Sequence, residues 1–329
     1  MGQQDMFKTF RKTLIISAIA LSTQAVTAVG NPAFADYPEK PIEVIVGYSA
    51  GGGTDVLARV VGKYLEKELG NDASVVIKNQ PGAGDQIGFT SVAKAKANGT
   101  TLGTFNLPAA MALTYDRKAA YDVNSFDYLA NVVHDPNTLV VSQDSPYHSL
   151  KELIQAAKEK PGSVGMALAS LGGNDHFSAL LLAAAADTEF NLIPFSGASM
   201  ARTALLGGHV AAGTMALSQT IGFEDELRVL AVLDDKRSSF APDVPTAKEQ
   251  GYDVTMGSYR GFVAPHGLPE KVRTRLVTAF KALADNENLL DELAAQGNTL
   301  DIITGEDYRQ LSESQADVAK KLWESHPWK

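Results

Sequence analysis

The sequence of 329 residues contains no cysteine, which excludes disulfides, thiolate metal ligands and a cysteine nucleophile. It also has no basic tract. Lys and Arg number 29 against 38 Asp and Glu, and the net charge of −9 argues against nucleic acid or an anionic membrane as a partner. The six histidines form no H-E-x-x-H motif and no i, i+4 pair, and no phosphate-binding P-loop motif occurs. We therefore expect neither a metal nor a cofactor.

The first 35 residues have the composition of a secretory signal peptide. Lys8, Arg11 and Lys12 form a positive region, 14–21 is apolar, and 33–35 (AFA) is typical of a cleavage site. The apolar run is too short to span a bilayer, and no later run is long enough. Cleavage would remove three basic residues and one acidic residue, which leaves a net charge of −11. We expect an exported, soluble, periplasmic protein.

Strand and helix patterns alternate along the rest of the chain. The apolar, β-branched run 42–47 leads into a glycine-rich turn, and a helix with 3.6-residue periodicity follows at 54–69. The same criteria predict helices at 86–97, 150–160, 175–186, 199–206, 269–284 and 306–323, and strands at 74–78, 101–105, 164–169, 190–195, 210–216 and 228–233. This alternation predicts an α/β fold with parallel sheets.

Two glycine-containing loops occupy matched positions in this pattern. Ser49–Asp55 (SAGGGTD) and Ser170–His176 (SLGGNDH) start 121 residues apart, and each lies between a buried strand and a helix N-terminus. The repeat predicts two lobes with one such loop each. Two extended runs, 126–142 with an interruption at 135–137 and 253–264, are interpreted as the strands that cross between the lobes.

A loop of this kind binds an anion without lysine or arginine, because the helix N-terminus presents unpaired N–H groups and a partial positive charge. Two such loops across a cleft would hold a ligand with two anionic ends. The alternative is that the glycines only permit tight turns between strand and helix.

Several single residues have both a binding and a structural interpretation. Asp55 either contacts ligand or forms an i, i+4 ion pair with Arg59. His176 either donates to a ligand carboxylate or braces its loop. Arg202 is interpreted as a solvated helix residue, and Arg260 as a hinge or cleft candidate. Three aromatic residues line an apolar cleft or pack in the core: Tyr48, Phe195 and Tyr259.

A catalytic alternative rests on Gly47–Gly51, which reads G-x-S-x-G between a strand and a helix, as in the nucleophile elbow of serine hydrolases. Ser49 would be the nucleophile. No HGGG-like oxyanion segment precedes it, and none of the histidines has a distinguishing context. A hydrolase therefore remains the alternative of a different class.

The order and spacing of further motifs resemble one family from about Tyr37 to the C-terminus. These motifs are Y-P-x-K-P-I at 37–42, AGGGTD at 50–55, NQPGAG at 79–84, SLKEL at 149–153, PFSG at 194–197, ALLGGH at 204–209, PDVPT at 242–246 and FVAP at 262–265. In these features the chain resembles the substrate-binding proteins of tripartite tricarboxylate transporters, the Bug or TctC-like family.

The resemblance implies a two-lobed, Venus-flytrap (type II-like) periplasmic binding protein, each lobe a mainly parallel sheet flanked by helices. Residues 1–35 would be the signal peptide, 36–137 with 258–329 lobe 1, and 138–257 lobe 2. The ligand would be a small organic acid, delivered to membrane permease subunits. A sensor kinase as partner is compatible with the same fold and site.

The resemblance also assigns the carboxylate-binding loops to Tyr48–Asp55 and Ser170–His176, with Asn106–Ala110, 195–197 and 215–218 facing the same cleft. In the second loop, Asn174 and Asp175 stand where many relatives have small hydroxyl residues. An aspartate there would repel a carboxylate or accept a hydrogen bond from a ligand hydroxyl or amine. The candidate ligand-binding residues are Tyr48, Ser49, Gly52, Gly53, Thr54, Asp55, Asn106, Ala109, Ser170, Gly172, Asn174, Asp175, His176, Phe195, Ser218 and Tyr259.

Overall fold

The computed structural model describes residues 37–83, 85–117 and 119–328, so the signal peptide predicted for 1–35 lies outside the described residues. The strands are β1 (Ile42–Val46), β2 (Val75–Asn79), β3 (Thr101–Leu107), β4 (Phe126–Ser142), β5 (Gly165–Leu168), β6 (Asn191–Pro194), β7 (Ala212–Ala216), β8 (Leu227–Leu233), β9 (Gly257–Pro265) and β10 (Thr299–Thr304). The α-helices are α1 (Gly53–Leu69), α2 (Gln86–Ala93), α3 (Ala109–Asp116), α4 (Leu150–Glu159), α5 (Asn174–Ala186), α6 (Ala198–Leu206), α7 (Glu270–Ala282), α8 (Glu287–Ala294) and α9 (Glu306–Ser325). None of the helices described is both long and apolar enough to cross a bilayer.

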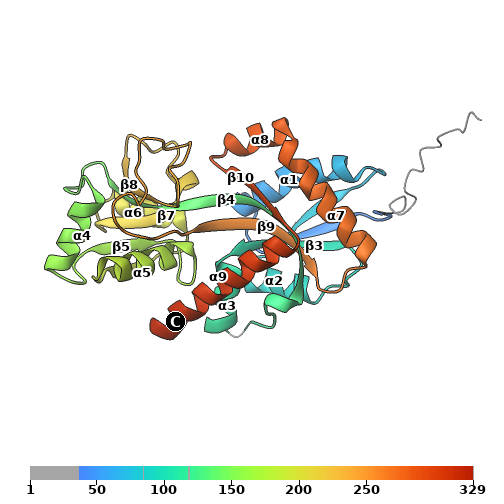
Figure 1. Cartoon of the computed structure of the whole chain (residues 1–329), viewed down its shortest axis with the longest axis horizontal. Helices are drawn as coiled ribbons and strands as arrows, with labels where there is room; N and C mark the ends of the chain where they lie inside the picture. The colour runs from blue at the N-terminus through green and yellow to red at the C-terminus, as the bar shows by residue number, and fades with distance from the viewer. Residues whose placement is uncertain (1–36, 84, 118, 329) are drawn as a thin grey trace, which may run out of the picture. The chain divides into compact units, whose positions relative to one another are not determined.

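The strands fall into two groups that share β4. In group A, β1 pairs in parallel with β2 and β3, β9 lies antiparallel between β3 and β4, and β10 pairs antiparallel with β4. In group B, β5 pairs in parallel with β6 and β7, whereas β7 and β8 pair antiparallel with β4. The first part of β4 belongs to group A and its last part, from Asn137, to group B. Figure 1 shows β4 and β9 extending between the two groups.

Each group therefore contains three parallel strands within a mixed sheet, less uniformly parallel than the sequence predicted. The antiparallel pairs arise because β4 leaves group A and β9 returns to it beside β4. The strand β4 is also continuous through 135–137, where the sequence predicted an interruption. Pro136 is the last residue paired with β9, and the ladders to β7 and β8 begin at the next residue. Proline is tolerated at such a junction because it ends one ladder.

Three elements had no sequence prediction: α3, α8 and β10. In α3 the residues Ala110–Leu113 are all buried, so this helix lacks the apolar stripe on which the helix prediction depends. It starts directly after Pro108, and the loop predicted at 106–110 is therefore the end of β3 and the first turn of α3.

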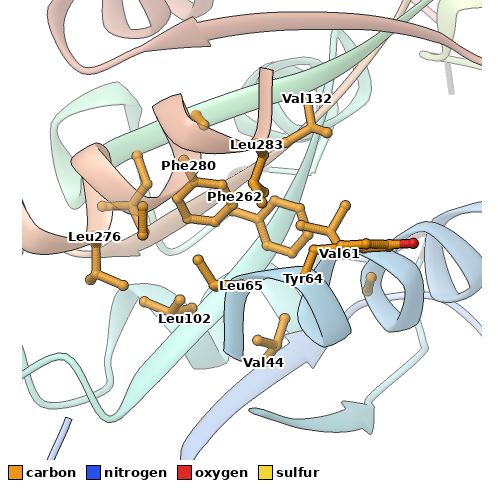
Figure 2. Packing of buried hydrophobic residues seen from close by; sticks show 14 of the residues in the cluster. Val44, Val61, Tyr64, Leu65, Leu102, Val132, Phe262, Leu276, Phe280 and Leu283 are labelled. Carbon is orange, nitrogen blue, oxygen red and sulfur yellow. The ribbon is translucent and has the colours of Figure 1, made fainter. Parts of the chain in front are cut away.

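The core of group A lies between its sheet and the helices α1, α7 and α8. Phe262 of β9 packs on Phe280 of α7 with ring centroids 5.2 Å apart, and Leu65 of α1 lies in the same cluster (Figure 2). The side chain of Phe280 is completely buried. A second cluster joins α4, α5 and the strands of group B. The two cores provide fixed supports for the helix N-termini described below.

Removing the ring of Phe280 is expected to destabilise the protein by about 3–5 kcal/mol, because the substitution Phe280→Ala leaves a cavity beside Phe262. The neighbouring Lys281→Ala on the same helix is exposed and is expected to change stability by less than about 0.5 kcal/mol. Urea unfolding of both variants measures the difference. Equal stabilities would show that this cluster is not a rigid support.

Candidate functional site

A cavity of about 470 Å³ is lined by residues of both strand groups. The lining residues are Tyr48, Gly52, Gly53, Thr54, Asp85, Asn106, Leu107, Ala109, Ala169, Ser170, Gly173, Asn174, Ser196, Gly197, Ala198, Ser199, Gln219, Ser258 and Arg260. Two smaller cavities, of about 340 and 380 Å³, are each lined within one group. Of these three cavities, the one of about 470 Å³ is the one that a ligand between the groups would occupy. Among the described residues, no cluster of His, Asp or Glu is placed to hold a metal ion.

The N-terminus of α1 contributes free donors to this cavity. Gly52 is the N-cap and has no side chain to cap the helix. The N–H groups of Gly53, Thr54 and Asp55 have no acceptor among the described residues. They are donors that the helix itself does not use, and the helix dipole adds a partial positive charge at the same place.

Asp55 holds this loop together rather than facing the cavity. Its carboxylate accepts the Gly51 N–H at 2.8 Å, the Asn79 side-chain amide at 2.8 Å and two hydrogen bonds from Arg59. Burial raises the pKa of Asp55, but these hydrogen bonds outweigh it, so the pKa lies below the usual 3.8. The side chain is only 3% exposed. The structure thus favours the ion-pair interpretation of Asp55.

The N-terminus of α5 repeats the arrangement in group B. Gly173 is an uncapped N-cap, and the N–H groups of Asn174 and Asp175 have no described acceptor. The Asp175 carboxylate accepts the Ala169 N–H at 3.1 Å and the Asn137 side-chain amide at 3.0 Å. Among the ion pairs of the described residues, none joins Asp175 to a cation as Arg59 is joined to Asp55, and burial raises the pKa of Asp175 to about 6. Its carboxylate is used within the loop, so it does not face the cavity.

His176 braces the same loop. Its Nδ1 accepts the Gly172 N–H at 3.2 Å, and its ring packs edge-on against Trp328 with centroids 5.4 Å apart. Burial lowers the pKa of His176 to about 4, so the ring is neutral at pH 7. Because Nδ1 is used within the loop and His176 does not line the cavity, the structure favours the bracing interpretation over donation to a ligand.

Three polar side chains add to the cavity wall. The Asn106 amide donates to the Thr54 hydroxyl at 2.8 Å, which leaves the hydroxyl proton of Thr54 free for an acceptor in the cavity. Asn106 Oδ1 and Gln219 Oε1 are buried without a hydrogen-bond partner. Arg202, predicted to be solvated, instead donates to the Gln219 carbonyl at 3.0 Å and lies over the Phe223 ring, because α6 packs against that segment.

Arg260 is the cation in the cavity wall, and its charge is already paired. It donates to Asp135 of β4 at 2.8 Å and to the side chain of Asn298 at 3.0 Å. The same carboxylate accepts the hydroxyl of Ser218 at 2.6 Å. A Cβ added to Gly53 would lie 3.9 Å from Arg260 Nη1, so the guanidinium stands beside the start of α1. The sequence left open whether Arg260 lies at a hinge or in the cleft, and its place in the cavity wall agrees with the cleft position.

The structure divides the predicted site residues into two sets. Those that line the cavity are Tyr48, Gly52, Gly53, Thr54, Asn106, Ala109, Ser170 and Asn174. Those that lie outside its lining are Ser49, Asp55, Gly172, Asp175, His176, Phe195, Ser218 and Tyr259. Tyr259 stacks on His134 at 4.4 Å, Phe195 packs against the core beside α6, and Ser49 is exposed at the surface.

Several cavity residues were not predicted from the sequence, among them Asp85, Gln219 and Ser258, and Arg260 was predicted only as a hinge or cleft candidate. Asp85 follows the sequence Gly-Ala-Gly between β2 and α2, the same order of strand, glycine-rich sequence and helix as in the two predicted loops. That order was a usable signal for Asp85. Arg260 lies beside Asn106 because β3 and β9 pair in that register, which no local pattern reveals.

Replacing Asp55 by asparagine is expected to lower the free energy of unfolding by about 1–3 kcal/mol at pH 7, because the Arg59 ion pair and one strong acceptor are lost. Since the folded-state pKa lies below 3.8, this stabilisation is present above about pH 4 and is lost as the pH falls further. Urea unfolding should show a smaller difference at pH 3 than at pH 7. The exposed Asp72→Asn is the control, and a difference independent of pH would contradict this assignment.

Known proteins show strong similarity to this chain. Residues 57–326 match the family described as "Tripartite tricarboxylate transporter family receptor", TctC. Protein BugT of Bordetella pertussis is 33% identical over 305 residues, which cover 91% of this chain and 92% of BugT. The crystal structure of a TctC solute binding protein from Polaromonas is 29% identical with a TM-score of 0.76, and the match covers 88% of this chain and 99% of that one.

Two similar structures are described with ligands. MatC from Rhodopseudomonas palustris with bound malate is 25% identical with a TM-score of 0.73, and the match covers 87% of this chain and 99% of MatC. R. palustris Rpa4515 with adipate is 25% identical with a TM-score of 0.77, and the match covers 88% of this chain and 98% of Rpa4515. The predicted α/β binding-protein fold is confirmed by these matches. The chain belongs to the TctC family, the periplasmic solute-binding receptors of tripartite tricarboxylate transporters.

Proposed function

We propose that the protein captures a small organic acid between two lobes and delivers it to a tripartite tricarboxylate-type membrane transporter. The ligand class is a di- or tricarboxylate, a hydroxy acid or a related carboxylate. The observation that carries the proposal is the pair of uncapped helix N-termini, at Gly53 and Asn174, which open on one cavity. The malate and adipate described for the two R. palustris proteins support the same class.

One ligand carboxylate would accept the free N–H groups at the start of α1 and the hydroxyl proton of Thr54. The Ser170–Asn174 segment would hold the other end of the ligand, in part through ordered water. Burying a carboxylate is costly unless several donors converge on it, and the two helix N-termini supply such donors without a lysine or an unpaired arginine. The protein's negative net charge makes local dipoles the attraction for an anionic ligand.

We further propose that binding closes two lobes about β4 and β9. Lobe 1 would comprise residues 36–137 and 258–329, and lobe 2 residues 138–257. A ligand that contacts both lobes stabilises the closed state, which is the form that a permease recognises. Cleavage after Ala35 would release the protein into the periplasm. A sensor kinase is an alternative recipient of the closed form.

The geometry around Ser49 supports binding rather than catalysis. Ser49 is exposed, lies outside the cavity and is separated from the start of α1 by three residues, whereas a nucleophile elbow places its serine directly at the turn into the helix. Among the described residues, no histidine ring is hydrogen-bonded to its hydroxyl. We therefore propose that the protein is not an enzyme.

Gly53→Leu is expected to weaken carboxylate binding by more than about tenfold while the fold is retained. A Cβ at this helical position has room, with only Arg260 Nη1 at 3.9 Å, but the rest of the side chain would extend into the cavity. The control is Ala50→Leu, an exposed residue outside the cavity.

The assay is a thermal-shift screen of residues 36–329 against organic acids, with protein unfolded and refolded beforehand to remove any ligand acquired during expression. A ligand at 100 times its Kd stabilises the protein by about 2.7 kcal/mol. Unchanged affinity in Gly53→Leu would remove the start of α1 from the site. No shift with any acid would contradict the proposed function.

Ser49→Ala is expected to bind the same ligand within about twofold of the wild type, because its side chain lies outside the cavity. The measurement is calorimetric titration, accompanied by an assay of ester hydrolysis with both proteins. Hydrolysis by the wild type that is lost in the variant would support the hydrolase alternative.

A further inference from the structure

We propose that the ligand carries a protonated amine as well as a carboxylate, and that the amine binds Asp85. This inference rests on the proposed function and narrows its ligand class to aminated carboxylic acids. It begins from the charge of the cavity wall. The charged side chains in that wall are Asp85 and Arg260, and they differ in whether their charge is paired.

The backbone conformation and the surroundings of Asp85 distinguish it from an ordinary exposed acidic residue. It is the N-cap of α2 with φ of 73°, a left-handed conformation that favours glycine and strains most other residues. The Tyr48 hydroxyl lies close enough to this carboxylate to lower its pKa, and Tyr48 also lines the cavity. The two carboxylate oxygens have acceptor capacity for further donors.

Two described cations are relevant to Asp85, Arg260 in the same cavity wall and Arg117 outside it, and both already have partners. Arg260 is paired with Asp135 at 2.8 Å and with the side chain of Asn298. Arg117 donates to the Ala83 carbonyl at 2.7 Å, lies 3.5 Å from an Asp116 oxygen, and is half-exposed. Arg117 acts on Asp85 through space only, without a direct ion pair among the contacts of the described residues.

Asp85 also differs from the two aspartates of the helix N-termini. Asp55 and Asp175 direct their carboxylates into their own loops and are satisfied there. The sequence suggested a ligand hydroxyl or amine as a partner of Asp175. Because the carboxylate of Asp175 is used within its loop, Asp85 is the carboxylate to which we assign the amine. A partly buried carboxylate without a cation is costly, so a cationic ligand group beside Asp85 would stabilise the closed cavity.

The unpartnered polar atoms of the cavity wall also favour a ligand that donates hydrogen bonds. Asn106 is 6% exposed, and its Oδ1 has no hydrogen-bond partner. Gln219 Oε1 is likewise buried and unpartnered. Both atoms are acceptors, as is the Asp85 carboxylate, and all three belong to residues that line the cavity. A ligand that carries hydrogen-bond donors as well as a carboxylate could satisfy these acceptors, whereas a second ligand carboxylate would add another acceptor.

The pH dependence follows from the groups around Asp85. Burial raises the pKa of Asp85 to about 6, although the nearby Tyr48 hydroxyl and Arg117 pull it down. Tyr121 also acts on Asp85, and burial holds the pKa of Tyr121 far above its usual value. An ammonium ligand that requires the ionised carboxylate should bind roughly tenfold more weakly at pH 5 than at pH 7.5.

The test compares acids that share a skeleton and differ in one substituent, by calorimetric titration of refolded residues 36–329. The sets are propionate, lactate and alanine; succinate, malate and aspartate; and butanoate, 4-hydroxybutanoate and 4-aminobutanoate. In at least one set, the aminated acid is expected to bind at least about tenfold more tightly than the other two acids of that set. In Asp85→Asn this advantage disappears, together with the loss of affinity at pH 5. Because Asp175 also has a pKa near 6, only the pH effect that Asp85→Asn abolishes counts.

The variants are chosen so that misfolding cannot imitate the result. Asparagine adopts the left-handed conformation readily, so Asp85→Asn should fold. Asp187→Asn is the matched control, because Asp187 also has a positive φ, 48°, but is exposed at the end of α5. Tyr48→Phe removes the hydroxyl beside Asp85. It should change the ratio of the affinities for aminated and unsubstituted acids without abolishing carboxylate binding.

The outcomes separate this inference from the proposed function. If hydroxy acids or unsubstituted acids bind the wild type more tightly than the aminated acids, or if Asp85→Asn keeps the amine preference, the inference is overturned while carboxylate binding stands. If no acid of any set binds the refolded protein, the proposed function fails as well.

Discussion

Two buried aspartates, Asp55 and Asp175, hold the walls of the cavity in place. Each lies in the first turn of a helix and accepts a backbone N–H from the loop that leads into that helix. Each also accepts the side-chain amide of an asparagine from a neighbouring strand, Asn79 or Asn137. With the loops fixed in this way, the first N–H groups of both helices remain unused and available. Under the proposed function, these two protein carboxylates would not contact the ligand but would hold in place the loops that bind its carboxylate.

The distribution of charge explains how an acidic protein can bind an acid. The guanidinium of Arg260 is close to the start of α1, but Asp135 neutralises it, and Ser218 binds the same carboxylate from the other strand group. The attraction for an anion therefore comes from helix dipoles and free N–H groups, which act over short distances. We propose that these dipoles bind one ligand carboxylate and that Asp85, in the same cavity wall, selects the second functional group of the ligand. The long-range field of the protein contributes little to such selection.

The alternation of strands and helices and the two matched loops were predictable, because both depend on local patterns of apolar residues and glycine. The direction in which a side chain points could not be predicted in this way. Asp55, Asp175 and His176 occupy the predicted loops, yet each turns inward, because capping and loop hydrogen bonds decide its orientation. Arg260 reaches the cavity through the register of β3 with β9, a pairing between residues far apart in the sequence. Asp85 follows the sequence Gly-Ala-Gly between a strand and a helix, a local signal from which no site residue was predicted.

The central claim is that the free N–H groups of two helices bind one ligand, and amide NMR tests it directly. Proton–nitrogen correlation spectra of refolded residues 36–329 would be recorded during titration with a small carboxylic acid that binds. The account predicts that the amide resonances of Gly53, Thr54 and Asn174 shift most, toward the positions of stronger hydrogen bonds. Shifts confined to other regions, with these three amides unchanged at saturation, would contradict it.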